Sequence, residues 1–176
     1  QPEMSEHLWM YEGVTEYFSH LVQLQAELID EDKFFEEIRG KINRADDYDP
    51  FSMTVMSKNV LEKEYQDLYT NVYTKGAVLA FLLDLEIMKQ TDGEKTLKDV
   101  LLQLTKKYGP ENPFNDEDII KDIVETTSPK VQDFFDKYII GSEIPDYSKS
   151  LEEIGYDYSK SFTRKIYYFG DIGLKL

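Results

Sequence analysis

The chain has 176 residues, 41% of them hydrophobic, so one domain can bury roughly two-thirds of its unfolded surface without disulfides. Its 20 Lys and Arg against 35 Asp and Glu give a formal charge of −15, which repels phosphate groups and anionic lipids, so neither nucleic acid nor a membrane surface is expected as a partner. The absence of cysteine excludes disulfides and thiolate chemistry and fits either the cytoplasm or the periplasm.

No apolar stretch approaches the ~20 residues that a bilayer crossing needs, so we expect a soluble protein. The chain begins Gln1-Pro2-Glu3 and shows no targeting signal. We interpret this beginning as a cut within a longer protein.

The first half of the chain shows the periodicity of helices. Apolar residues recur at steps of three and four over residues 8–28, which predicts a long amphipathic helix. Asp30 is expected to cap a second helix, and the Asp- and Pro-rich residues 46–50 to end it. Residues 51–69 indicate a helix with an irregular entry. Residues 72–88 are apolar on nearly every side and predict a buried central helix.

Helix signals continue through the second half of the chain. Further helices are predicted from a Thr96 cap to Gly109-Pro110, from an Asn115/Asp118 capping box through residue 123, from Ser128-Pro129 to Gly141, and over residues 150–154. Aromatic residues among Ser, Thr and Lys after residue 155 are typical of an extended strand.

These elements predict a mainly α fold, an irregular array of about seven helices with a short extended C-terminal segment. We expect one helical domain over residues 1–155 and an extended segment over residues 156–176. The apolar spacing holds no register across several heptads, which argues against a coiled coil.

Glu12 is the first candidate functional residue. On a helical wheel it shares the polar face of the first helix with Thr15 and Glu16, opposite the apolar Val14 and Tyr17. A solvated glutamate is the simplest interpretation of such a position. Gly13 beside it favours a specific role for this segment. A glycine inside a helix costs ~1 kcal/mol relative to alanine and often permits close approach of another backbone or a ligand.

The segment from Leu8 to Tyr17 reads L-W-x-x-E-G-x-T-x-Y and resembles the third-ligand segment of the gluzincin zinc metallopeptidases, in particular the glycyl-aminopeptidase family related to aminopeptidase N. In that family two histidines of an H-E-x-x-H helix and the glutamate of this segment hold a zinc ion. The resemblance implies that Glu12 is a zinc ligand. It extends in the family's order to about Gly155, and in the family a PDZ-like module follows, into which residues 156–176 could lead.

A second segment, Tyr73 to Ala77, reads Y-T-K-G-A and resembles the Y-x-K-G-A motif of the same clan. There the tyrosine donates a hydrogen bond to the oxyanion during amide hydrolysis, so the resemblance assigns this catalytic role to Tyr73. A buried tyrosine that satisfies its hydroxyl in the core is the alternative. Gly76 and Ala77 share the side of Tyr73 on the wheel, and such small residues allow another segment to approach closely.

The chain departs from the family pattern because it contains no H-E-x-x-H, and its histidines are only His7 and His20. A catalytic zinc needs three protein ligands and an open position for water. We therefore expect no zinc in the isolated chain and no peptidase activity from it. A separate metal site from His7, Glu12, Glu16 and His20 is disfavoured, because i,i+4 pairs such as Glu16 and His20 usually form a surface hydrogen bond.

Two functions follow as hypotheses. In the first, the chain is a fragment of a zinc-dependent aminopeptidase-like enzyme that supplies Glu12 and Tyr73; its partners are the missing upstream half of the catalytic domain and a peptide substrate. In the second, it is a non-catalytic acidic helical interaction module, with Trp9 and Tyr11 at the edge of a partner site. Substrate specificity cannot be read from these residues.

Overall fold

The computed structural model describes residues 4–159. The chain divides into two compact units, Gln1–Pro145 and Asp146–Leu176. The first contains α1 (Leu8–Gln25), α2 (Glu31–Ala45), α3 (Met53–Asn59), the 3-10 helix η1 (Lys63–Val72), α4 (Thr74–Gln90), α5 (Leu97–Lys107), α6 (Asp116–Thr126), the 3-10 turn η2 (Pro129–Val131), α7 (Gln132–Phe134) and the π-helix η3 (Phe135–Ile140). The second contains α8 (Tyr147–Glu152). The predicted mainly helical fold is confirmed, and residues 4–159 contain no strand.

The predicted helix starts follow their capping residues. Asp30 accepts a hydrogen bond from the backbone of Lys33 at 2.8 Å and begins α2. Thr96 and Asp99 form a reciprocal capping box at α5. The capping box predicted at Asn115 is wrong in its bonding: the Asn115 amide donates to the Asp118 carboxylate at 3.1 Å, and no side chain caps the backbone of α6.

Two segments differ from their predicted form. The first helix ends at Gln25, and Leu28 beyond it is 75% exposed rather than part of the apolar face. The irregular stretch after residue 50 is α3 followed by the 3-10 helix η1. Ser52 caps α3 by accepting from the backbone of Val55 at 3.2 Å.

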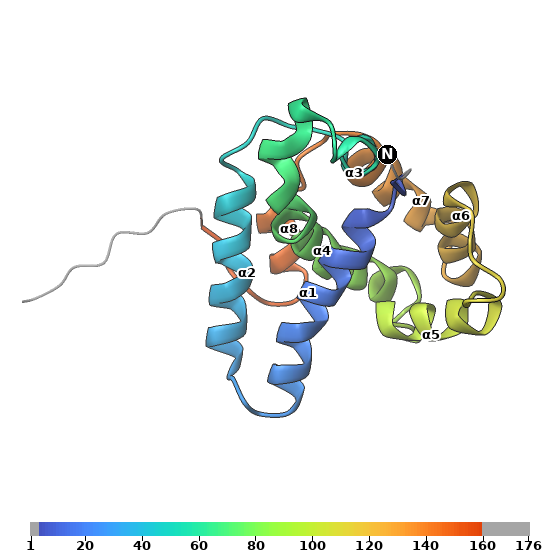
Figure 1. The fold of residues 1–176 in the computed structure, drawn as a ribbon. Coiled ribbons are helices and arrows are strands. Elements are labelled where there is room, and N and C mark those ends of the chain that lie inside the picture. Colours follow the sequence, from blue (N-terminus) through green and yellow to red (C-terminus); the bar gives the residue numbers. More distant parts are fainter. Residues whose placement is uncertain (1–3, 160–176) are drawn as a thin grey trace, which may run out of the picture. The chain divides into compact units, whose positions relative to one another are not determined.

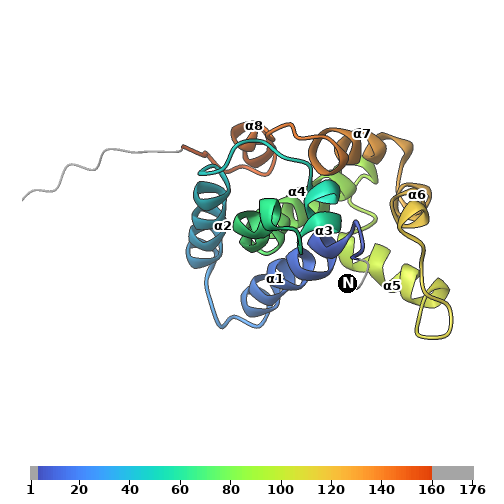
Figure 2. The same ribbon diagram turned by 45° about the horizontal axis from the view of Figure 1, so that its top comes forward.

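Helix α4 is the centre of the first unit, as its apolar sequence predicts. Every residue from Lys75 to Asp84 is buried. Among the described elements, the most extensive packing is between α1 and α4, and the next most extensive is between α2 and α4. Figure 1 shows α1 and α2 joined by a turn at their lower ends with α4 passing behind α1, and Figure 2 again places α4 beside both helices.

An aromatic cluster joins these three helices. The ring of Phe81 on α4 lies 5.9 Å from that of Tyr17 on α1, and 6.1 and 6.3 Å from those of Phe34 and Phe35 on α2. Such tilted and edge-to-face pairs add about 0.5–1.5 kcal/mol each beyond the area that they bury. These ring contacts help to hold α1 and α2 in their packing positions against α4.

The second unit is described only in part. Asp146 caps α8 by accepting from the backbone of Lys149 at 3.1 Å. Gly155 follows with a φ of 86°, and residues 156–159 are not helical. The strand expected over residues 156–176 falls outside the described residues from 160 onward. The domain boundary at residue 155 and the module after it therefore stay predictions. Within residues 4–159 no helix combines the length and the apolar character needed to cross a bilayer.

A buried carboxylate ties α1, α4 and α5 together. Asp84 accepts a hydrogen bond from the Tyr17 hydroxyl at 2.7 Å and another from the backbone of Leu97 at 2.7 Å. Burial raises the pKa of Asp84, while the bonds from Leu97 and Tyr17 oppose that rise. One side chain thus satisfies a buried phenol and the first free N–H of α5.

We expect Asp84→Ala to destabilise the chain by about 2–4 kcal/mol, because it leaves both buried donors without an acceptor. Asp84→Asn keeps one amide oxygen and should cost less. Glu86→Ala is the control, since Glu86 lies on the same helix, is half-buried and accepts a hydrogen bond from Gln90 one turn on; it should change stability by less than about 0.5 kcal/mol. Denaturant unfolding monitored by circular dichroism measures all three, and equal losses for Asp84→Ala and Glu86→Ala would contradict this role.

Candidate functional site

Helices α1 and α4 touch backbone to backbone at two glycines. A Cβ atom on Gly13 would lie 2.4 Å from the carbonyl carbon of Gly76 and 2.6 Å from its Cα. A Cβ on Gly76 would lie 3.0 Å from the Gly13 Cα and 3.0 Å from the carbonyl oxygen of Trp9. The helices can approach this closely only because neither position carries a side chain. The close approach predicted at both glycines is confirmed, and each is the partner of the other.

The glycine contact brings together the two residues singled out in the sequence. Glu12 directly precedes Gly13, and Tyr73 stands at the N-terminus of α4, three residues before Gly76. The pKa of Tyr73 is raised by a hydrogen bond with the Tyr69 hydroxyl, by desolvation, and by a hydrogen bond with the Glu12 carboxylate and its negative charge. Glu12 and Tyr73 are both half-buried. The Glu12 charge thus acts on the Tyr73 phenol, and both side chains remain partly accessible to solvent.

Tyr69 is a member of this site that the sequence analysis did not single out. Its hydroxyl oxygen lies 3.3 Å from that of Tyr73, and the two rings meet edge to face with centroids 5.9 Å apart. The sequence feature that could have identified Tyr69 is its spacing of four residues from Tyr73. Such a spacing predicts contact only in a regular helix, and Tyr69 lies in the 3-10 helix η1, whose form the sequence left open.

Trp9 supports the start of α1 from within the core. Its side chain is fully buried, and its backbone N–H donates to the hydroxyl of Ser57 on α3 at 3.1 Å. The expectation that Trp9 lies at the edge of a partner site is wrong, because no part of its side chain reaches the surface. Tyr11 is 71% exposed, so only this second aromatic of the segment faces solvent.

The buried side chain of Lys75 connects the start of α4 to the segment before α3. Its ammonium group donates to the carbonyl oxygen of Phe51 at 3.1 Å and lies 4.1 Å from the centre of the Phe51 ring. Burial lowers the pKa of Lys75 to about 8. The lysine of the Y-x-K-G-A segment thus ties the chain before α3 to the turn that presents Tyr73.

A charged cluster continues the Glu12 face of α1. Glu16, one turn after Glu12, lies 2.5 Å from the buried ammonium of Lys41 on α2 and 3.5 Å from the ring of His20. The hydrogen bond from Lys41 lowers the pKa of the Glu16 carboxyl. The surface hydrogen bond expected for Glu16 and His20 is not formed, because His20 Nε2 has no hydrogen-bond partner within residues 4–159. Glu16 instead joins α1 to α2 through Lys41.

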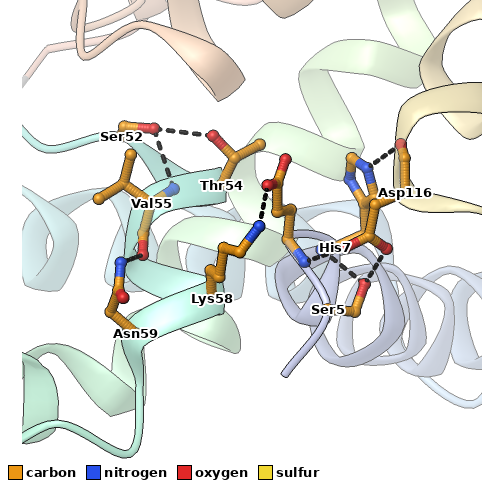
Figure 3. A network of polar contacts seen from close by, with 9 residues as sticks. Ser5, His7, Ser52, Thr54, Val55, Lys58, Asn59 and Asp116 are labelled. Carbon is orange, nitrogen blue, oxygen red and sulfur yellow. Dashed lines mark hydrogen bonds and ion pairs between the residues drawn. The ribbon is translucent and has the colours of Figure 1, made fainter. Parts of the chain in front are cut away.

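His7 lies in a different network, at the beginning of α6 (Figure 3). Its Nε2 is 2.9 Å from the carbonyl oxygen of Asp116. The Asp116 carboxylate accepts from the Ser5 hydroxyl at 2.6 Å and from the backbone of Glu6 at 2.8 Å. Figure 3 shows Ser5 and His7 beside Asp116. The Lys58 ammonium on α3 donates to the Glu6 carboxylate at 2.7 Å. The network fixes the segment that enters α1.

The histidines are therefore not assembled with Glu12. Among residues 4–159, no group of three or more His, Cys, Asp or Glu side chains is placed to hold a metal ion. In this part of the chain, Glu12 is therefore not grouped with enough further ligands to hold a metal ion.

A known protein family matches the part of the chain that contains the candidate site. The family model of M61 glycyl aminopeptidases matches residues 1–79, which contain Glu12, Gly13, Tyr73 and Gly76. The resemblance expected from the sequence is thus confirmed for that region. No curated protein sequence matches the chain.

A solved structure shares the fold. A crystal structure described as an aminopeptidase N family protein from Idiomarina loihiensis superposes with a TM-score of 0.74 at 24% sequence identity, over 86% of this chain. The match covers 28% of that protein. The chain thus spans about a quarter of the length of this structural relative.

We expect Gly13→Ala to destabilise the protein by about 3 kcal/mol, because its methyl group would collide with the Gly76 backbone, which no side-chain rotation relieves. Gly40→Ala is the matched control. Its methyl group would meet only the Arg44 side chain, at 3.5 Å, and should stabilise α2 by about 0.5–1 kcal/mol through helix propensity. Urea unfolding of both variants tests the close approach. A Gly13→Ala protein as stable as Gly40→Ala would refute it.

Proposed function

We propose, from the relation of this chain to the M61 glycyl aminopeptidases, that it is the helical part of a zinc-dependent aminopeptidase-like catalytic domain. The observation that carries the proposal is the Gly13–Gly76 backbone contact, beside which Glu12 on α1 and Tyr73 at the start of α4 lie close enough for the Glu12 charge to raise the Tyr73 pKa. Their pairing beside a close helix crossing supports a shared site.

Glu12 fits the part of a zinc ligand. Its carboxylate supplies an oxygen of the kind that zinc accepts from proteins, and it is half-buried on a helix that the glycine contact holds rigidly. Zinc in such a site would polarise a substrate carbonyl and activate a water molecule. Two further ligands would come from an H-E-x-x-H helix in another part of the protein, and Glu12 would complete the set.

Tyr73 fits the part of an oxyanion donor. A tyrosine phenol is protonated at neutral pH, so the Tyr73 hydroxyl can serve as a hydrogen-bond donor. Beside Glu12, it would face the substrate carbonyl oxygen as negative charge develops there. One well-placed donor of this kind contributes about 3 kcal/mol to a transition state.

The function then belongs to a larger protein. We expect the isolated chain to be inactive and to bind no zinc tightly, since it would supply one ligand of three. Its partners would be the upstream part of the catalytic domain and a peptide substrate. That the chain spans 28% of its structural relative supports this division.

An interaction module remains the second candidate, favoured by the exposure of Tyr11 next to Glu12. Of the two aromatic residues expected at its partner site, Trp9 is fully buried and cannot contact a partner. The same exposed surface also serves the first proposal, as the wall on which the missing part of the domain would lie.

In the complete protein, we expect Tyr73→Phe to lower kcat by about 100-fold, with KM and zinc content unchanged, because the phenol would act only in the transition state. Glu12→Ala should abolish both zinc retention and activity. Hydrolysis of aminoacyl anilides and metal analysis of the purified proteins measure these effects.

Glu16→Gln is the control for Glu12, because Glu16 lies one turn further on the same face of α1 but pairs with Lys41. It should retain zinc. A complete protein that keeps its zinc after Glu12→Ala, or whose kcat is unaffected by Tyr73→Phe, would refute the proposal.

A further inference from the structure

Two phenol hydroxyls meet at the candidate site, and one of them has no role so far. Tyr69 is 43% exposed, yet its hydroxyl lies 3.3 Å from that of Tyr73 instead of pointing away into solvent. The edge-to-face ring contact, with an interplanar angle of 77°, holds both side chains in this arrangement. The two tyrosines also come from adjoining elements, since η1 ends at Val72 and α4 begins at Thr74.

The direction of the hydrogen bond follows from what each group can donate. A tyrosine hydroxyl has one proton, and a carboxylate can only accept. The Tyr73 hydroxyl lies 3.3 Å from the Tyr69 hydroxyl, and the negative charge of the Glu12 carboxylate also acts on it. Either hydroxyl could donate in the bond between the tyrosines. The negative charge of Glu12 favours the arrangement in which the Tyr73 proton turns toward Glu12 and Tyr69 donates to the Tyr73 oxygen.

We propose that Tyr69 is a positioning residue for Tyr73, which donates to the Tyr73 oxygen and thereby points the Tyr73 proton toward the Glu12 side of the site. The inference rests on the proposed function, because the substrate carbonyl would stand on that side. A hydroxyl that accepts one hydrogen bond also becomes a stronger donor of the next. Tyr69 would thus both orient and strengthen the donor without touching the substrate.

A purely structural role for Tyr69 is the alternative, in which only its ring matters. Tyr69→Phe separates the two, because it keeps the ring and removes the hydroxyl. Tyr65→Phe is the matched control: Tyr65 lies in the same helix η1 and is not among the groups that act on Tyr73.

The test uses the complete protein and aminoacyl anilide hydrolysis. Tyr69→Phe should lower kcat about three- to tenfold, the size of one neutral hydrogen bond, with KM unchanged. In a Tyr73→Phe background, where the oriented hydroxyl is gone, adding Tyr69→Phe should cause no further loss. Tyr65→Phe should leave kcat and KM as they are.

The outcomes separate the inference from the function on which it rests. If Tyr73→Phe lowers kcat but Tyr69→Phe does not, the positioning role is wrong and the proposed function stands. If the losses from Tyr69→Phe and Tyr73→Phe simply multiply in the double variant, Tyr69 acts independently of Tyr73 and the inference is overturned. If the complete protein has no zinc-dependent turnover, both fall.

Discussion

The contact between Gly13 and Gly76 is the constraint on which the rest of this structure depends. Two helices whose backbones approach so closely leave no room for a side chain at the crossing, and neither glycine can be replaced without moving a backbone. The residues beside the crossing are consequently fixed against each other. Glu12 and Tyr73, far apart in the sequence, meet because each lies close to one of the two glycines.

Buried polar groups around the crossing give each helix a single orientation. Asp84 binds α1 to α4 through Tyr17 and reaches the start of α5, while Lys41 holds the Glu16 side of α1 against α2. A helix pair joined only by apolar contacts could rotate or slide at small cost. These hydrogen bonds would be broken by such a movement, and an unsatisfied buried group costs about 1–3 kcal/mol.

The sequence predicted the elements whose signals are local. Helices α1, α2, α4 and α5 follow from apolar periodicity and from caps such as Asp30 and Thr96. Gly13 and Gly76 were each expected to allow a close approach, but a single sequence does not tell which segments approach each other. The 3-10 helix η1 and the π-helix η3 were not predicted, because packing rather than local propensity selects them. For the same reason Tyr69 was missed and Trp9 was expected in the wrong place. The roles of Glu12 and Tyr73 came from the family resemblance and remain proposals.

The coupling between Glu12 and Tyr73 tests the account most directly, and the chain of 176 residues is sufficient for the measurement. Unfolding free energies of the original protein, Glu12→Ala, Tyr73→Phe and the double variant give a double-mutant cycle. A hydrogen bond between the two half-buried groups predicts a coupling energy of about 1 kcal/mol. Losses that add within about 0.3 kcal/mol would mean that the glycine crossing does not bring the two residues together, and would contradict the site proposed here.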